Sequence, residues 1–197
     1  MYSLDHALYQ HLLGINDSQG ATSNVATVTV NTVAAVSDSG SKAGSGIKIQ
    51  NAGMGAVTVA VTNNQIRQYN NFGIEFLTGG GATAQSGALN ATVTGNTVSN
   101  PGTGGLPMNG VHLNGGTVPG DTYQICTDIG SAGGLANALV GSGFNGGTDF
   151  SLRQRQSATV RLPGYAGANT AVVSFVQGRN TVPTGGGFIG GAACALP

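Results

Sequence analysis

The sequence predicts an all-β fold, a parallel β-solenoid in which short strands stack in successive coils. Three observations predict it. Glycine accounts for 35 of the 197 residues, apolar and polar residues alternate over short segments, and these segments recur about every 32 residues. Alternation indicates strands, because successive side chains of a strand point to opposite faces. Recurrence at a fixed spacing of this size is typical of stacked repeat proteins.

The first expected element is a short helix. Leucines recur at helical spacing ahead of Gly14, and we expect residues 1–20 to cap the first coil. This segment does not read as a secretory signal, because Asp5 and His6 stand where positive charge is required and the apolar stretch is too short. An exported protein would therefore need a leader from outside the given sequence.

Residues 21–197 are expected to form the β-helix domain, with an irregular C-terminal portion. Each repeat holds two alternating segments joined by a linker of variable length. The anchors Val33, Ile66 and Val98 are 33 and 32 residues apart. The segments are 27–33 with 46–49, 60–66 with 73–76, 92–98 with 110–113 and, more weakly, 123–129 with 149–152.

Stacked coils about 4.8 Å apart bring equivalent residues into columns along the solenoid axis. We expect Asn31, Asn64 and Asn96 to form a ladder of side-chain hydrogen bonds, as stacked asparagines do in cross-β structures. Apolar residues should form the inward columns. These are Val28, Val61 and Val93; Ile47, Ile74 and Val111; and Ile49, Phe76 and Leu113.

The pattern of alternating Val and Thr, then Asn-x-Val/Ile, a loop and Gly-Ile/Val-x-Leu resembles the repeats of pectin-lyase-like proteins over residues 26–113. The resemblance implies a right-handed parallel β-helix. It implies no single activity, because that scaffold carries lyases, hydrolases, adhesins and passive stalks. Segments 152–155, 160–165 and 185–191 are similar to the closing segments of very large bacterial surface proteins built of β-strand repeats, which implies a surface or secreted module.

Composition excludes several classes of function. With 7 Lys plus Arg, 7 Asp plus Glu and a net charge of zero, the chain lacks the basic patch of a nucleic-acid binder. No apolar run reaches the roughly 20 residues of a membrane span. No cofactor or metal motif is present, since two cysteines alone cannot hold zinc. Low charge with abundant Asn, Thr and Gly favours an extracellular or cell-surface protein.

Cys126 and Cys194 both lie in the C-terminal part of the chain. We expect a disulfide that fastens the tail. The alternative is a pair of buried free thiols, which pack as small apolar side chains.

The repeat alignment yields one candidate catalytic constellation. The outward positions of the Gly-Ile-x-Ile segments are Lys48, Glu75, His112 and Ser151, which should stack in one exposed column. Glu75 would orient His112, and His112 would accept a proton from Ser151, as in a nucleophile, base and orienter set. The sequence therefore allows a secreted hydrolase, esterase-like or glycan-active. The alternative is a ladder of charges, with Lys48 against Glu75.

Other exposed positions suggest binding. Arg153 and Arg155 alternate with inward residues and would contact acidic glycans. Thr29, Thr62 and Thr94 would form one column of a flat threonine array, which resembles ice-binding surfaces. Our main expectation is a module with a structural, adhesive or glycan-contacting role. Its partners would be polysaccharides or cell-surface glycans, with self-association through exposed solenoid ends.

Overall fold

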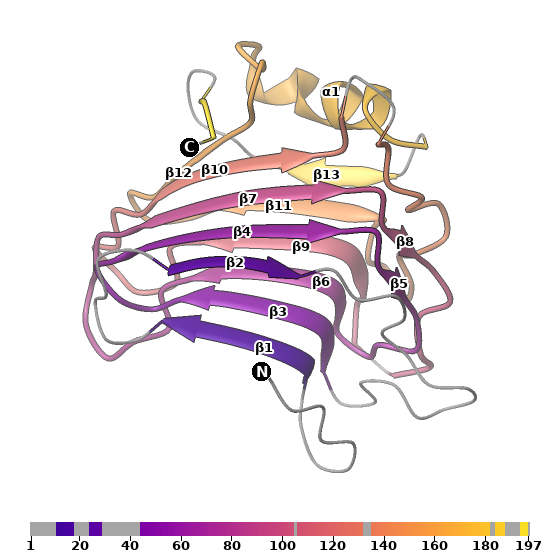
Figure 1. Ribbon diagram of the computed structural model, residues 1–197, viewed down its shortest axis with the longest axis horizontal. Helices are drawn as coiled ribbons and strands as arrows, with labels where there is room; N and C mark the ends of the chain where they lie inside the picture. The colour runs from indigo at the N-terminus through magenta and orange to yellow at the C-terminus, as the bar shows by residue number, and fades with distance from the viewer. Residues whose placement is uncertain are drawn as a thin grey trace.

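The computed structural model describes residues 11–17, 24–28, 44–104, 106–131, 135–181, 184–187 and 194–196. It is a parallel β-solenoid with two main sheets lying face to face (Figure 1). The six-stranded sheet has the order β1 (His11–Asp17), β3 (Ser45–Asn51), β6 (Phe72–Thr78), β9 (Asn109–Gly115), β11 (Phe150–Gln154) and β13 (Gly185–Gly187). The five-stranded sheet has the order β12 (Thr159–Arg161), β10 (Gln124–Ile129), β7 (Ala88–Thr94), β4 (Ala56–Thr62) and β2 (Asn24–Val28).

The chain visits the sheets in a fixed order, which makes each circuit one coil. After a strand of the six-stranded sheet comes one of the five-stranded sheet, and then, in two coils, β5 (Gln65–Ile66) or β8 (Thr97–Val98) of a small third sheet. The main strand pairs are all parallel. The predicted solenoid is confirmed, while its right-handedness remains a prediction.

The register between coils confirms the predicted apolar columns. Ile47 pairs with Ile74, Ile74 with Val111, and Val111 with Phe150. These four side chains are fully buried. The column of Phe76 and Leu113 continues in the same way to Leu152. The column of Val61 and Val93 in the five-stranded sheet continues to Ile129. Burial of large aliphatic and aromatic side chains, at about 1.5–3 kcal/mol each, stabilises the interior.

A column of glycines explains why the segments of β3, β6 and β9 begin Gly-Ile or Gly-Val. A Cβ on Gly46 would lie 2.6 Å from Cγ2 of Ile66 and 2.8 Å from the carbonyl oxygen of Gly73. Gly73 and Gly110 are as tightly enclosed, by Val98 and by Ser142. The third sheet therefore approaches this corner too closely for any side chain at these positions.

The asparagine ladder is confirmed and is longer than predicted. Nδ2 of Asn64 donates to Oδ1 of Asn96 at 2.8 Å, and Nδ2 of Asn96 donates to Oδ1 of Asn137 at 2.9 Å. Nδ2 of Asn137 donates in turn to Oδ1 of Asn180 at 2.8 Å. Each acceptor oxygen also receives the backbone N–H of the preceding asparagine in the ladder. The predicted member Asn31 lies outside the described residues.

The N-terminal helix predicted over residues 1–20 is wrong where the structure describes that segment. Residues 11–17 form strand β1, which pairs in parallel with β3 and sets Leu13 beside Ile47 and Ile15 beside Ile49. Leu13 and Ile15 are two residues apart, which fits strand alternation and not helical spacing, and a strand there gains the ladder hydrogen bonds of β3. Residues 1–10 lie outside the described part of the chain.

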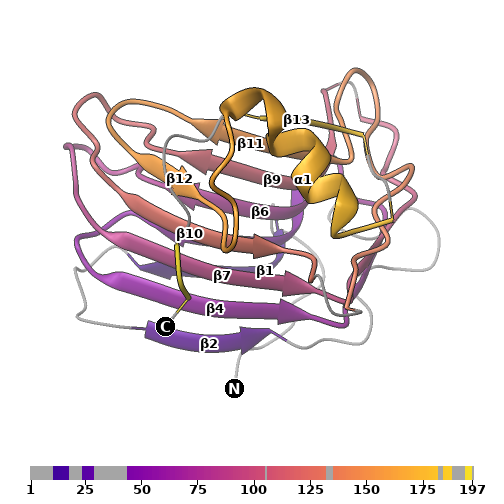
Figure 2. The same cartoon turned by 90° about the horizontal axis from the view of Figure 1, so that it is seen from above.

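The C-terminal part contains a helix that the sequence analysis did not predict. A 3-10 turn, η1 (Asn169–Ala171), leads into α1 (Val172–Gly178), whose Val172 and Val176 are fully buried in the core. Figure 2 shows α1 lying across the end of the stacked coils. The predicted disulfide between Cys126 and Cys194 is confirmed. Among the described residues, no helix has the length and apolar character to cross a membrane.

Candidate functional site

The outer face of the six-stranded sheet carries the predicted row Lys48, Glu75, His112 and Ser151. Parallel register pairs Lys48 with Glu75, Glu75 with His112, and His112 with Ser151. The stacking of these residues one coil apart is therefore as the repeat alignment predicts. The prediction that the whole row is exposed is wrong, because Glu75 is only 6% exposed and His112 only 7%.

Glu75 is engaged by the coil before it. The Ser45 hydroxyl donates to Oε2 of Glu75 at 2.6 Å, and Nζ of Lys48 lies 3.7 Å from Oε1. Both partners come from β3, whereas His112 lies on the opposite side, on β9. The Lys48–Glu75 charge ladder, offered above as the alternative to a catalytic set, is thus present.

His112 lies in an apolar setting. Its ring stacks on Phe72, with centroids 4.1 Å apart and an interplanar angle of 16°. Burial, and secondly the charge of Arg153, lower the pKa of His112 to about 4, so the ring is neutral at pH 7. Its Nδ1 atom is buried and has no hydrogen-bond partner.

A second row runs beside the first on the same face. Gln50 pairs with Leu77, Leu77 with Asn114, and Asn114 with Arg153. The side-chain oxygen of Asn114 is buried without a partner, while Arg153 is exposed. Two unpartnered polar atoms, on His112 and Asn114, thus lie two residues apart on one face of β9.

Four of the acidic side chains, all those described beyond residue 44, are bonded within the protein. Besides Glu75, Asp121 accepts the backbone N–H groups of Gln85 and Val118, and Asp149 accepts those of Ser142, Gly143 and Thr184. Asp128 forms an ion pair with Arg179. In contrast, neither a hydrogen bond nor an acidic partner engages the side chains of Arg67, Arg153, Arg155 and Arg161 within the described chain. Although the net charge is zero, these arginine side chains are therefore available to bind an acidic ligand.

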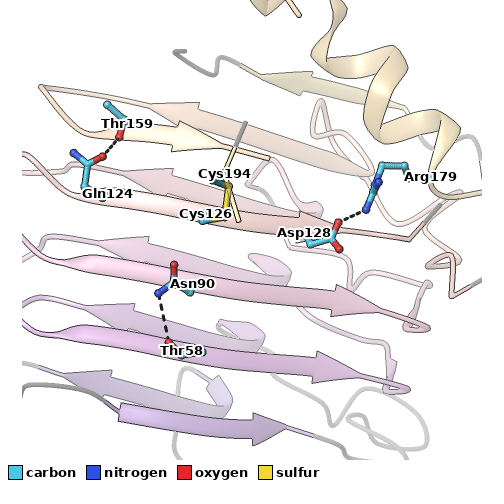
Figure 3. Close-up of a disulfide and its surroundings, with 8 residues drawn as sticks. All are labelled: Thr58, Asn90, Gln124, Cys126, Asp128, Thr159, Arg179 and Cys194. Atoms are coloured by element: carbon cyan, nitrogen blue, oxygen red, sulfur yellow. Dashed lines mark hydrogen bonds and ion pairs between the residues drawn. A yellow bond between two sulfur atoms is a disulfide. The ribbon is translucent and has the colours of Figure 1, made fainter. Parts of the chain in front are cut away.

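The outer face of the five-stranded sheet carries Thr58, Asn90 and Gln124 beside the disulfide and the ion pair of Asp128 with Arg179 (Figure 3). One of its rows pairs Thr58 with Asn90, Asn90 with Cys126, and Cys126 with Arg161. In the candidate ice-binding array, Thr62 and Thr94 are paired as predicted, but Thr94 is buried. Thr29 lies outside the described residues.

Sequence analysis missed Ser45, Phe72 and Asn114. Ser45 and Phe72 each stand directly before the corner glycine of their segment. Each side chain contacts the row residue of the next coil, so Ser45 contacts Glu75 and Phe72 contacts His112. This constant position before the glycine is the signal that was available in the sequence.

No three His, Cys, Asp or Glu side chains converge as a metal site in the described part of the chain. No family model, no curated protein and no solved structure matches the chain.

Proposed function

We propose that this protein is an extracellular β-solenoid module that binds acidic polysaccharide through the outer face of its six-stranded sheet. The observation that carries the proposal is that the acidic side chain of this face has partners within the protein, whereas a basic side chain of the same face has none in the described chain. Glu75, the acidic residue of the row, is bonded to Ser45 and Lys48. Arg153, two strands away in the neighbouring row, is exposed with no acidic partner in the described chain. A planar guanidinium matches the geometry of a carboxylate or sulfate group.

The geometry of the sheet suits a polymer. Parallel coils repeat equivalent positions about every 4.8 Å, so polar groups stand in rows along the axis. The unpartnered atoms of His112 and Asn114 supply hydrogen-bonding positions for sugar hydroxyls, because a buried polar atom without a partner costs about 1–3 kcal/mol. A ligand that satisfies those atoms recovers that cost.

The extracellular placement rests on the disulfide between Cys126 and Cys194, since disulfides persist in oxidising compartments. The resemblance of the repeats to pectin-lyase-like proteins and of the C-terminal segments to bacterial surface proteins agrees with it. The same resemblance supports a right-handed coil, the usual hand for parallel crossovers.

Retention of the folded protein on immobilised polygalacturonate, against a neutral glucan of similar length, tests this function. We expect Arg153→Gln to weaken binding by about tenfold, as loss of one charged hydrogen bond does. The matched control is Arg67→Gln, which removes the same charge from an exposed position just after β5. Equal losses in both variants, or no retention of the unaltered protein on either polymer, would refute the proposal.

A secreted hydrolase is the second candidate, favoured by the pairing of Ser151 with a neutral His112. Two facts weaken it. Within the described chain, His112 shows no hydrogen bond to Ser151 or Glu75, and a base with a pKa near 4 accepts a proton poorly at neutral pH. Hydrolysis of p-nitrophenyl acetate that is lost in both Ser151→Ala and His112→Ala would establish this activity, and activity unchanged by either substitution would exclude these residues.

A further inference from the structure

A cavity opens on the outer face of the five-stranded sheet, away from the proposed polysaccharide face. Its volume is about 90 Å³, and its walls include Asn90, Gln124, Arg161 and the disulfide of Cys126 with Cys194. At about 30 Å³ for each water molecule, it has room for about three waters, or for a carboxylate group with a neighbouring hydroxyl. Figure 3 shows the disulfide standing on this face between the strand of Asn90 and that of Thr159.

Arg161 brings an unpaired charge to this cavity. It lies on β12 beside Cys126 of β10 and is half-buried. Its Nε atom is buried and has no hydrogen-bond partner. Asp128, on the same strand as Cys126, is occupied by Arg179. A guanidinium keeps its proton under all ordinary conditions, so Arg161 keeps its positive charge and its N–H donors, for which the described chain supplies no acceptor.

The two amides of the cavity complete a mixed set of hydrogen-bonding groups. Asn90 uses Nδ2 to donate to the Thr58 hydroxyl at 3.4 Å, which leaves Oδ1 as an acceptor. Gln124 uses Oε1 to accept from the Thr159 hydroxyl at 2.7 Å, which leaves Nε2 as a donor. The walls thus offer a cation and a neutral donor for a carboxylate, and an acceptor for a hydroxyl.

We propose that this cavity binds the carboxylate of a sugar acid. Arg161 takes the carboxylate, with Nε2 of Gln124 as the second donor, and Oδ1 of Asn90 accepts a hydroxyl of the same ligand. The ligand is either a free hydroxy acid or a uronate residue of a polysaccharide. Because Cys126 and Cys194 form part of the wall, the site depends on the disulfide.

Titration of ¹⁵N-labelled protein with glucuronate tests the site through the Arg Nε–H resonances, with Arg161→Gln used to assign the relevant signal. We expect a saturable shift of the Arg161 signal, and affinity at least tenfold lower in Arg161→Gln and in Cys194→Ser. Arg67→Gln is the matched control and should leave affinity unchanged. A glucuronate titration that leaves the Arg161 Nε–H signal unmoved overturns the proposal, whether or not the variants fold.

Further titrations distinguish a free hydroxy acid from a uronate of a polymer, and distinguish this cavity from the proposed polysaccharide face. Acetate that binds about tenfold more weakly than glucuronate supports the contact of a hydroxyl with Asn90, while equal affinities support a site for simple carboxylates. Binding of an oligogalacturonide tighter than that of the monomer assigns the site to a polymer. Arg153→Gln should leave glucuronate binding at Arg161 intact, so failure of the polysaccharide face and failure of this cavity are distinguishable.

Discussion

Polar side chains are buried in two regions of this protein, and the two regions treat them differently. In the asparagine ladder, Asn96 accepts two hydrogen bonds and donates to Val61, Thr94 and Asn137. On the outer face of the six-stranded sheet, His112 and Asn114 each bury an atom that has no hydrogen-bond partner among the described residues. The comparison teaches that burial of polar groups serves the fold where the groups are satisfied, and leaves bonding capacity for a ligand where they are not.

The largest effect is expected in the ladder. Asn96→Ala removes the acceptor of the Asn64 backbone N–H and the donor to two backbone carbonyls. The Asn64 backbone N–H and the Val61 carbonyl lose a partner in the interior, while the Thr94 carbonyl keeps the backbone N–H of Asn63. The free energy of unfolding should therefore fall by about 3 kcal/mol. Urea denaturation followed by circular dichroism measures the change.

The matched control for that prediction is Asn90→Ala in β7, on the outer face of the five-stranded sheet in the same coil. Asn90 makes one long hydrogen bond, at 3.4 Å, to Thr58 and is half-buried. Its loss should cost no more than about 0.5 kcal/mol. Similar losses in the free energy of unfolding for Asn96→Ala and Asn90→Ala would show that the hydrogen bonds of the ladder contribute no more to stability than those of the outer face.

An effect of comparable size is expected from pH at His112. The pKa of about 4 in the folded protein lies below the ordinary value of 6.5, so the unfolded chain binds more protons between these limits. Stability due to the neutral ring is therefore complete above about pH 6.5 and is lost as the pH falls to about 4, by about 3 kcal/mol for this shift.

Replacement of His112 by Phe isolates this contribution. The variant keeps a ring to stack on Phe72 and removes the titrating group. The two proteins differ at this position alone, so the difference between their stability profiles reports the substituted ring. Parallel profiles from pH 7 to pH 4 would show that burial does not hold the ring neutral.

The smallest effect is expected for Asn114→Leu. This substitution removes the unpartnered side-chain oxygen and places an apolar side chain next to Leu77. Stability should stay constant or rise by up to about 1 kcal/mol, because no satisfied acceptor is lost. Thermal unfolding measures this change, and a clear fall in stability would show that Asn114 serves the fold after all.

Sequence analysis predicted the features that recur at a constant spacing. The apolar columns, the ladder pair Asn64 and Asn96, and the register of Glu75 with His112 all follow from the repeat of about 32 residues. In-register stacking makes such positions neighbours whatever the connecting loops do. The pairing of Cys126 with Cys194 followed from having only two cysteines in the chain.

The features that were missed break the constant spacing or depend on neighbouring coils. Asn137 and Leu139 continue the ladder and the pair of buried anchors Ile66 and Val98, but they follow Asn96 and Val98 by 41 residues because the loop after β10 is longer. The burial of His112 was missed for another reason. Alternation tells which face a side chain takes, and only the fold shows that Phe72 lies over it.

The disulfide also sets how the protein bears mechanical load. Cys194 is joined to Cys126 across 68 residues of chain, on β10, which lies between β12 and β7 in the five-stranded sheet. Tension applied at the C-terminal end passes through the sulfur atoms directly into β10. The segment between the two cysteines, with α1 and β11 to β13, is thereby bypassed. A force applied there would therefore not peel β11 to β13 away from the preceding coil one hydrogen bond at a time.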